Sequence, residues 1–210
     1  MDVLVTDILM PEMDGLELVS RMKKDVKYSH IPVLMLSARH NIEHKIEGYD
    51  AGADSYITKP FEMSVLIANI KSLVNNRKLQ AQSFSADTGA YNVEQYTNND
   101  IDREFLENVI KTIEENVLEK DFTTADLYEI FNMSQPTFYR KLQALIGISP
   151  NELIKKVKIN IARQMLVHRK LSVSEVAYEL GFSDPKYFST VFKKEVGINP
   201  GEYVKNHRIR

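Results

Sequence analysis

The 210-residue sequence contains no cysteine and no long apolar run. Without cysteine the chain can form neither a disulfide framework nor a thiolate metal site, and the absence fits a reducing cytoplasm. The longest apolar stretch, residues 31–36, is far shorter than the roughly 20 residues that cross a bilayer. No charged and then apolar leader opens the chain. We therefore expect a cytoplasmic chain without membrane contact.

The sequence motifs of several enzyme classes are also missing. There is no Walker loop, no nucleophile elbow and no pair of catalytic carboxylates. His40 and His44 stand four residues apart on a predicted helix, but no third ligand accompanies them, so we expect a solvated helix face. We predict that the chain is not an enzyme, with no catalytic residue and no metal site of its own.

The net charge is negative over the first two thirds of the chain and positive over the last third. Residues 1–77 carry a net charge of −2 and residues 100–133 a net charge of −7. Residues 134–210 hold 14 Lys and Arg against 6 Asp and Glu, a net charge of +8. A local excess of this kind suits a polyanionic partner, although a solvated helical surface would have the same composition.

Apolar runs of strand length alternate with helix-like segments over residues 1–77. The runs cover 3–6, 31–36 and 55–57, and the helical segments cover 15–24, 42–51 and 63–75. Near-continuous apolar strands separated by crossover helices favour an α/β fold with a parallel sheet. Residues 78–100 are polar without a sustained period, which predicts a linker, and residues 101–210 show the periodicity of an all-α domain.

The helical part repeats itself at an offset of fifty residues. The segment GISPNELI at 147–154 corresponds to GINPGEYV at 197–204, and Phe138 corresponds to Phe188. Before the turn the offset is forty-nine, which matches Met133 to Phe182. We infer two copies of one supersecondary unit.

Each copy predicts a helix, a short turn and a second helix. The second helix of the first copy covers 135–146, with Ser134 as N-cap and Pro136 in its first turn. The second helix of the second copy covers 185–196, with Ser183 or Asp184 as N-cap. We expect the apolar face of each helix in the core: Phe138, Leu142, Leu145 and Ile146 in the first, and Phe188, Phe192 and Val196 in the second.

The remaining faces of these two helices are short, polar and flanked by lysines. The major groove of DNA can accommodate a helix with a face of this kind. We predict that seven residues contact bases: Pro136, Tyr139, Arg140, Gln143, Lys186, Ser189 and Thr190. Arginine can donate two hydrogen bonds to guanine, and tyrosine and proline offer apolar contact to a thymine methyl group. We assign phosphate contacts, which position the protein without specifying sequence, to Lys141, Lys155, Lys156, Arg163, Lys193 and Lys194.

Residues 101–207 resemble the DNA-binding domain of the AraC/XylS transcription factors. The resemblance is carried by FYRKL at 138–142, GISP at 147–150, the pattern KI, A, ML at 158–166 and the long segment at 179–203. Lys158 stands where the family usually has arginine, which keeps the charge. The resemblance implies two helix-turn-helix units joined by one long helix, with both recognition helices entering successive major grooves about 34 Å apart.

Polar groups follow the ends of all three predicted strands. Asp7 ends the first, Ser37 the second, and Lys59 with Pro60 follows the third. Ligands of open parallel sheets bind at that edge. Residues 2–77 are similar to the receiver domain of response regulators, from its third strand to its last helix. The resemblance implies that Asp7 accepts a phosphoryl group, Ser37 and Lys59 hold its oxygens, Tyr56 is the aromatic switch, and the Lys59–Pro60 bond is cis.

In that family the first two strands contribute an acidic pair that binds Mg²⁺, and these strands have no counterpart here, so we expect a partial flavodoxin-like sheet. Mg²⁺ is expected for the complete receiver and not for this chain, which we do not expect to autophosphorylate. Three explanations stay open: a piece of a longer protein, a degenerate receiver used for docking, or a sheet completed by another chain.

The resemblances together predict a sequence-specific transcription regulator at the output end of a two-component phosphorelay. Its expected partners are double-stranded DNA, a histidine kinase as phosphodonor and a second copy in a homodimer. Hybrid sensors carry this arrangement at their C-terminus, so the parent protein could be attached to a membrane. Two alternatives remain: a phosphotransfer relay in which Asp7 matters and DNA does not, and a docking module with weak, salt-insensitive DNA binding.

Overall fold

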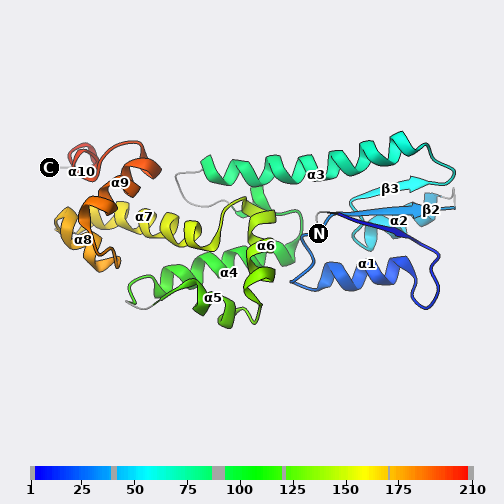
Figure 1. The fold of residues 1–210 in the computed structure, drawn as a ribbon, viewed down its shortest axis with the longest axis horizontal. Helices are drawn as coiled ribbons and strands as arrows, with labels where there is room; N and C mark the ends of the chain where they lie inside the picture. The colour runs from blue at the N-terminus through cyan, green and yellow to red at the C-terminus, as the bar shows by residue number, and fades with distance from the viewer. Residues whose placement is uncertain (1–2, 39–41, 87–92, 120–121, 170, 208–210) are drawn as a thin grey trace. The chain divides into compact units, whose positions relative to one another are not determined.

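The computed structural model describes residues 3–38, 42–86, 93–119, 122–169 and 171–207 (Figure 1). The chain divides into two compact units. The first comprises residues 1–85, 93–105 and 140–147, and the second comprises 86–92, 106–139 and 148–210. Each unit is described in turn.

The first unit is built on a three-stranded parallel sheet in the order β1-β2-β3. The strands are β1 (Leu4–Asp7), β2 (Val33–Ser37) and β3 (Ser55–Thr58), and the connecting helices are α1 (Gly15–Lys24) and α2 (Ile42–Asp50). In Figure 1 the strands lie between α1 and helix α3 (Met63–Ala86). The register pairs Asp7 with Leu36 and Ser37 with Thr58, so the three strand ends form one edge. The predicted partial α/β fold is confirmed.

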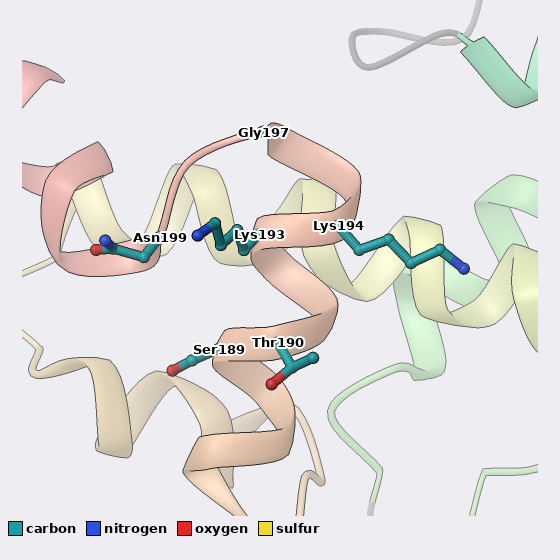
Figure 2. Close-up of a pocket in the computed structure, with 6 residues that line it drawn as sticks. All are labelled: Ser189, Thr190, Lys193, Lys194, Gly197 and Asn199. Carbon is teal, nitrogen blue, oxygen red and sulfur yellow. The ribbon is translucent and has the colours of Figure 1, made fainter.

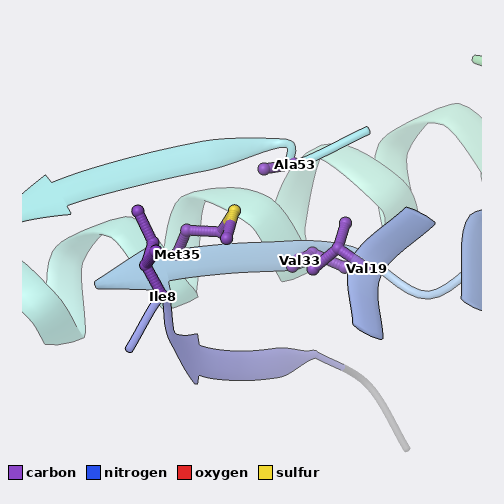
Figure 3. Close-up of a cluster of buried hydrophobic side chains, with 5 residues drawn as sticks. All are labelled: Ile8, Val19, Val33, Met35 and Ala53. Carbon is purple, nitrogen blue, oxygen red and sulfur yellow. The ribbon is translucent and has the colours of Figure 1, made fainter. Parts of the chain in front are cut away.

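The core of this sheet follows from the apolar sequence of its middle strand. Val33, Leu34 and Met35 are completely buried, as expected for a strand covered on both faces. Figure 3 shows Val33 and Met35 with Ile8, Val19 and Ala53, which form one buried apolar cluster. Burying a valine, isoleucine or methionine side chain of this cluster stabilises the fold by about 1.5 to 3 kcal/mol.

Helix α3 is longer than the sequence predicted. It extends to Ala86, through part of the segment that we expected to be linker, and a 3₁₀ turn, η1 (Val93–Tyr96), follows. The reason is a tertiary contact, because the buried rings of Phe84 and Tyr96 pack edge to face at 4.9 Å. The Gln80 amide also donates to Asn98 Oδ1 at 2.8 Å. Residues 78–86 are therefore helical, and residues 93–96 form a 3₁₀ turn.

The second unit is helical over its described residues. Its elements are α5 (Thr124–Ile130), α7 (Pro150–His168), α8 (Val173–Glu179), α9 (Pro185–Val196) and α10 (Pro200–His207), and α7 packs against the last three. Helices α4 (Asp100–Asn116) and α6 (Gln135–Ile146) contribute residues to both units. The predicted all-α region is confirmed. No helix of the described residues is both long and apolar enough to cross a membrane.

The repeat seen in the sequence is present in the backbone. The turn after α5 has Asn132 at φ 47°, and the turn after α8 has Gly181 at φ 75°. The amide of Met133 donates to Tyr128 O at 3.0 Å, and that of Phe182 to Ala177 O at 2.9 Å. The helices that open the two copies also share a capping box, Thr123 with Asp126 in α5 and Ser172 with Glu175 in α8.

Candidate functional site

The rim of the sheet brings Asp7 and Lys59 into direct contact. The Lys59 ammonium donates a hydrogen bond to Asp7 Oδ2, and the two side chains form an ion pair. The Lys59 amide donates to Ser37 O at 2.7 Å, which ties the end of β3 to the end of β2. Of the three residues that the sequence predicts at one rim, Asp7 and Lys59 are in contact through their side chains, and Ser37 is linked to Lys59 through its backbone carbonyl.

The charge state of Asp7 follows from that contact. The hydrogen bond from Lys59 lowers the pKa of the Asp7 carboxyl, against a smaller effect of burial, and the amide of Leu9 adds to the lowering. Asp7 is therefore an ionised, half-buried carboxylate at neutral pH. An ionised carboxylate beside an ammonium has the chemistry required of a phosphoryl acceptor.

A close backbone approach places helix α1 directly behind Asp7. The amide of Gly15 donates to Ile8 O at 2.9 Å, and Asp14 caps the helix by accepting from the amide of Leu16 at 2.8 Å. A Cβ on Gly15 would lie 2.0 Å from Asp7 O, so only glycine fits here. The Asp-Gly pair in the sequence thus fixes the turn that supports Asp7.

The other predicted rim residues have distinct environments. Ser37 is buried, and Tyr56 is half-buried with the Lys45 ammonium 5.7 Å from its ring centre. The Lys59–Pro60 bond is cis, as predicted. Whether Ser37 and Tyr56 have their expected roles stays a prediction.

The donor set does not fit a complete Mg²⁺ site. Across the described residues no three His, Asp or Glu side chains lie close enough together to hold a metal ion. At the rim the Asp7 carboxylate already accepts from Lys59, and hard cations need several oxygen ligands. His40 and the side chain of His44 lie outside the described residues.

Helix α6 has the two faces that the sequence predicts. Phe138, Leu142, Leu145 and Ile146 are buried, and the Phe138 ring packs edge to face against Tyr128 at 5.4 Å. The predicted base-contacting side chains are all exposed: Pro136, Tyr139, Arg140 and Gln143. Ser134, the predicted N-cap, directly precedes the helix. Its hydroxyl forms a hydrogen bond with the hydroxyl of Thr137 at 2.9 Å.

Helix α9 presents a similar exposed face. Asp184 caps it by accepting from the amide of Lys186 at 2.9 Å, which resolves the choice between Ser183 and Asp184. Lys186 and Thr190 are exposed and Ser189 is half-buried. On the other side Phe188 and Phe192 are buried, whereas Val196 is only half-buried.

An open hollow of about 550 Å³ lies beside α9 (Figure 2). Ser189, Thr190, Lys193 and Lys194 contribute to it from the helix, and Gly197 and Asn199 contribute from the turn that follows. Figure 2 shows the Lys193 and Lys194 side chains extending to opposite sides of α9, and exposed ammonium groups of this kind can contact an extended anion such as a nucleic-acid backbone. The Asn199 side chain also accepts a hydrogen bond from the amide of Glu202, in the first turn of α10, at 2.9 Å.

The predicted phosphate-contacting residues of the second unit differ in their exposure and in their side-chain partners. Lys155, Lys193 and Lys194 are exposed. Lys156 is paired with Glu195 at 3.2 Å. Arg163 donates to the Tyr203 hydroxyl at 3.3 Å and lies over the Tyr203 ring. The last two side chains therefore also stabilise the packing of α7 against α9 and α10.

The prediction for Lys141 disagrees with the structure. Its side chain is completely buried and its ammonium is paired with Asp102. A buried ammonium cannot contact a phosphate, so Lys141 does not belong to the accessible set in this conformation. The sequence placed it beside Arg140 on a basic helix and gave no signal of its partners.

Comparisons with known proteins agree with both halves of this description. Residues 1–71 match the model of the response regulator receiver domain, and residues 127–206 match that of a helix-turn-helix domain. The chain joins a receiver domain to an AraC-type helix-turn-helix domain. The charged rim therefore lies in the receiver domain, and the exposed faces of α6 and α9 belong to the AraC-type domain.

Individual relatives match one or both domains. The chain is 34% identical over 201 residues, 96% of its length, to a protein from Formosa agariphila named histidine kinase P4, and it spans 15% of that protein. It is 40% identical over 73 residues to the DNA-binding dual master transcriptional regulator RpaA from Synechocystis, covering 35% of this chain and 30% of RpaA.

A solved structure is similar to the helical domain. It is the C-terminal domain of AraT, a response regulator from Geobacillus stearothermophilus, at 28% identity and a TM-score of 0.46. The match covers 50% of this chain and 87% of that one.

Proposed function

We propose that the chain binds double-stranded DNA sequence-specifically, as the transcription-regulating output part of a two-component phosphorelay. The observation that carries the proposal is the pair of recognition helices, α6 and α9. Each buries its apolar face and exposes a short polar one, and exposed lysines flank the face of α9. The receiver domain and the AraC-type domain are regulatory modules, and we infer that the chain acts by binding rather than as an enzyme, in the cytoplasm.

We assign direct base contacts to the exposed face of α6, above all to Arg140, and to Lys186, Ser189 and Thr190 of α9. The hydroxyls of Ser189 and Thr190 donate to the carbonyls of Pro185 and Lys186 at 2.8 and 3.0 Å, so towards DNA they act as acceptors. We assign phosphate contacts to Lys155, Lys193 and Lys194. We assign them also to Lys156, which Glu195 holds in place, and to Arg163, which Tyr203 holds in place.

A selection from random duplex oligonucleotides at moderate ionic strength tests the proposal. The full chain is expected to enrich one preferred sequence, and Arg140→Ala is expected to enrich it less sharply. Lys205→Ala, which removes one exposed charge from α10 outside both recognition helices, is the matched control and should leave the preference unchanged. A pool without enrichment contradicts the proposal.

Phosphorylation is the second part of the proposal. Asp7 is the acceptor, Lys59 and Ser37 hold the phosphoryl oxygens, and Tyr56 is the switch residue. The phosphodonor is a histidine kinase, Mg²⁺ belongs to a complete receiver domain, and phosphorylation biases formation of a homodimer. The ionised Asp7 beside Lys59 supports this assignment.

The same Asp7–Lys59 pair favours an alternative, a phosphotransfer relay in which DNA binding plays no part. Intact-mass measurement after incubation with a small phosphodonor and Mg²⁺ separates the two. We expect no stoichiometric label on this chain, because the described residues do not fit a complete Mg²⁺ site. A stoichiometric label that Asp7→Asn abolishes, on a chain that enriches no duplex sequence, would favour the relay.

A further inference from the structure

Lys141 lies at the centre of a buried hydrogen-bonded network in the first unit. Its ammonium donates to Asp102 Oδ1 and, at 3.0 Å, to Ser29 Oγ. The Ser29 hydroxyl in turn donates to Asp102 Oδ1 at 2.7 Å. The second carboxylate oxygen accepts from Asn99 Nδ2 at 2.8 Å. Phe105 covers the group, with the ammonium 4.8 Å from its ring centre. The network therefore satisfies both charged groups.

Burial makes these contacts energetically significant. Lys141, Asp102 and Ser29 each have at most 1% of their surface exposed. A charge taken out of water is unfavourable unless it is paired and hydrogen-bonded, and breaking such a pair leaves the remaining charge uncompensated. Burial raises the pKa of the Asp102 carboxyl, but Lys141 and the hydrogen bonds from Ser29 and Asn99 outweigh it and lower the pKa overall. Burial lowers the pKa of the Lys141 ammonium, and Asp102 acts in the opposite direction. The contact between the two groups is that of an ion pair.

The network joins three parts of the chain that are distant in sequence. Ser29 lies between α1 and β2 of the receiver domain, Asp102 lies in the first turn of α4, and Lys141 lies in the first recognition helix next to the exposed Arg140. Ser29 and Lys141 are 112 residues apart. The recognition helix is therefore tied to the receiver domain through a residue with the charge to bind phosphate but without access to it.

We propose that Ser29, Asp102 and Lys141 form a latch that withholds Lys141 from the DNA backbone and so lowers DNA affinity until the latch opens. The inference rests on the proposed DNA-binding function. In the latched state the chain binds DNA without Lys141. In the open state the ammonium leaves Asp102 and neutralises one more phosphate. A change in the receiver domain that moves Ser29 shifts the balance between the two states.

The substitution Asp102→Asn tests the latch by removing the carboxylate that holds Lys141. Asp100→Asn is the matched control, because it makes the same charge change in the same helical turn at an exposed ion pair with Arg103. One added phosphate contact steepens the slope of log K against log salt by about 0.9, which corresponds to about tenfold tighter binding at 0.1 M salt. We expect this change for Asp102→Asn and not for Asp100→Asn.

Lys141→Met identifies the residue responsible. In the otherwise unchanged chain it is expected to leave the salt slope as it was, because Lys141 does not contact DNA. Combined with Asp102→Asn, it should make the slope less steep by about 0.9 than in Asp102→Asn alone. The proposal is overturned if Lys141→Met flattens the slope equally in the unchanged chain and in Asp102→Asn. Lys141 would then contact DNA without first being released from Asp102.

Acylation of lysines followed by peptide mass spectrometry gives a readout that does not require DNA. Lys141 is expected to react at least tenfold more slowly than the exposed Lys155 and Lys194, and to react comparably with them in Asp102→Asn. If circular dichroism shows that Asp102→Asn does not fold, Ser29→Ala replaces it. That variant keeps the ion pair and should give a reactivity between the two extremes.

The outcomes separate failure of the latch from failure of DNA binding. If Lys141 reacts as fast as Lys155 in the unchanged chain, the latch is wrong whatever the chain does with DNA. If Lys141 is protected and released as described but no duplex sequence is preferred, the DNA-binding proposal fails and the buried network stands. Protection that neither Asp102→Asn nor Ser29→Ala relieves also overturns the latch.

Discussion

At the scale of single residues, we predict that substitutions at Arg140 and at Lys155 separate base recognition from attraction to the DNA backbone. Both are exposed, but Arg140 lies on α6 and Lys155 lies on α7. A bidentate contact to guanine contributes about 1 to 3 kcal/mol of discrimination, whereas one phosphate contact contributes a salt slope of about 0.9.

Arg140→Ala should therefore weaken binding to the preferred duplex by about 1 to 3 kcal/mol and relax the base preference at one position. Lys155→Ala should weaken all duplexes alike and flatten the salt slope. Titrations of the preferred and a scrambled duplex at several salt concentrations measure both effects. The reverse pattern would show that the roles are exchanged.

His30 is a residue whose titration the fold strongly alters. Burial, together with the nearby Lys141 and Arg77, lowers its pKa to about 3, while Asp102 acts in the opposite direction. The folded protein thus keeps His30 neutral at a pH where the unfolded chain, with a pKa of about 6.5, is protonated. Protons bind preferentially to the unfolded state between these values, so stability falls as the pH drops below about 6.5.

The expected loss from His30 between pH 7.5 and pH 5 is about 2 kcal/mol in the free energy of unfolding. His30→Asn, which cannot titrate in this range, should lose less stability over the same interval. Urea unfolding of both chains at the two pH values measures the difference. Equal losses in the two chains would mean that His30 does not remain neutral in the fold.

At the scale of secondary-structure elements, the junction of β1 and α1 depends on Gly15. A Cβ there would overlap the Asp7 carbonyl oxygen, so Gly15→Ala must displace either α1 or the strand end that carries Asp7. We expect a loss of about 1 to 3 kcal/mol or more in stability, in the range of overpacked cores.

Gly201→Ala is the control for this substitution. Gly201 lies in the first turn of α10, and the atom nearest to an added Cβ is Asn199 Oδ1 at 3.5 Å, an ordinary contact. Alanine there should be neutral or stabilising, since it favours the helix. Chemical unfolding compares the two, and similar stabilities would contradict the close approach at Gly15.

Elements were predictable where local sequence determines them. Helix α1 covers the predicted residues. Asp14 caps its first turn, and the basic residues of its last turn stabilise its C-terminal end. The buried face of α6 also followed from the helical period, and the strand ends at Asp7 and Ser37 followed from the apolar runs that precede them. The end of α3 could not be predicted, because Phe84 is stabilised in the helix by Tyr96, twelve residues further along the chain.

At the scale of the whole molecule, the repeat in the helical region and the strand–helix alternation were sufficient to predict both domains. The burial of Lys141 was not predictable, since its partner Asp102 is 39 residues away and belongs to an acidic segment with no other distinguishing pattern. Composition gave the sign of each segment's charge but not which charges pair across the fold. The sequence thus predicted the exposed faces of the candidate site, whereas the buried Lys141–Asp102 pair became evident only in the structure.

The central claim is that α6 and α9 read one duplex together, and a spacing series tests it most directly. The full chain is titrated with its preferred duplex and with a variant that carries five extra base pairs between the two halves of the site. Five base pairs are about half a helical turn and place the halves on opposite sides of the duplex. We predict at least about tenfold weaker binding to the lengthened site, the equivalent of about 1.4 kcal/mol. Equal affinity for the two duplexes would contradict reading by paired recognition helices.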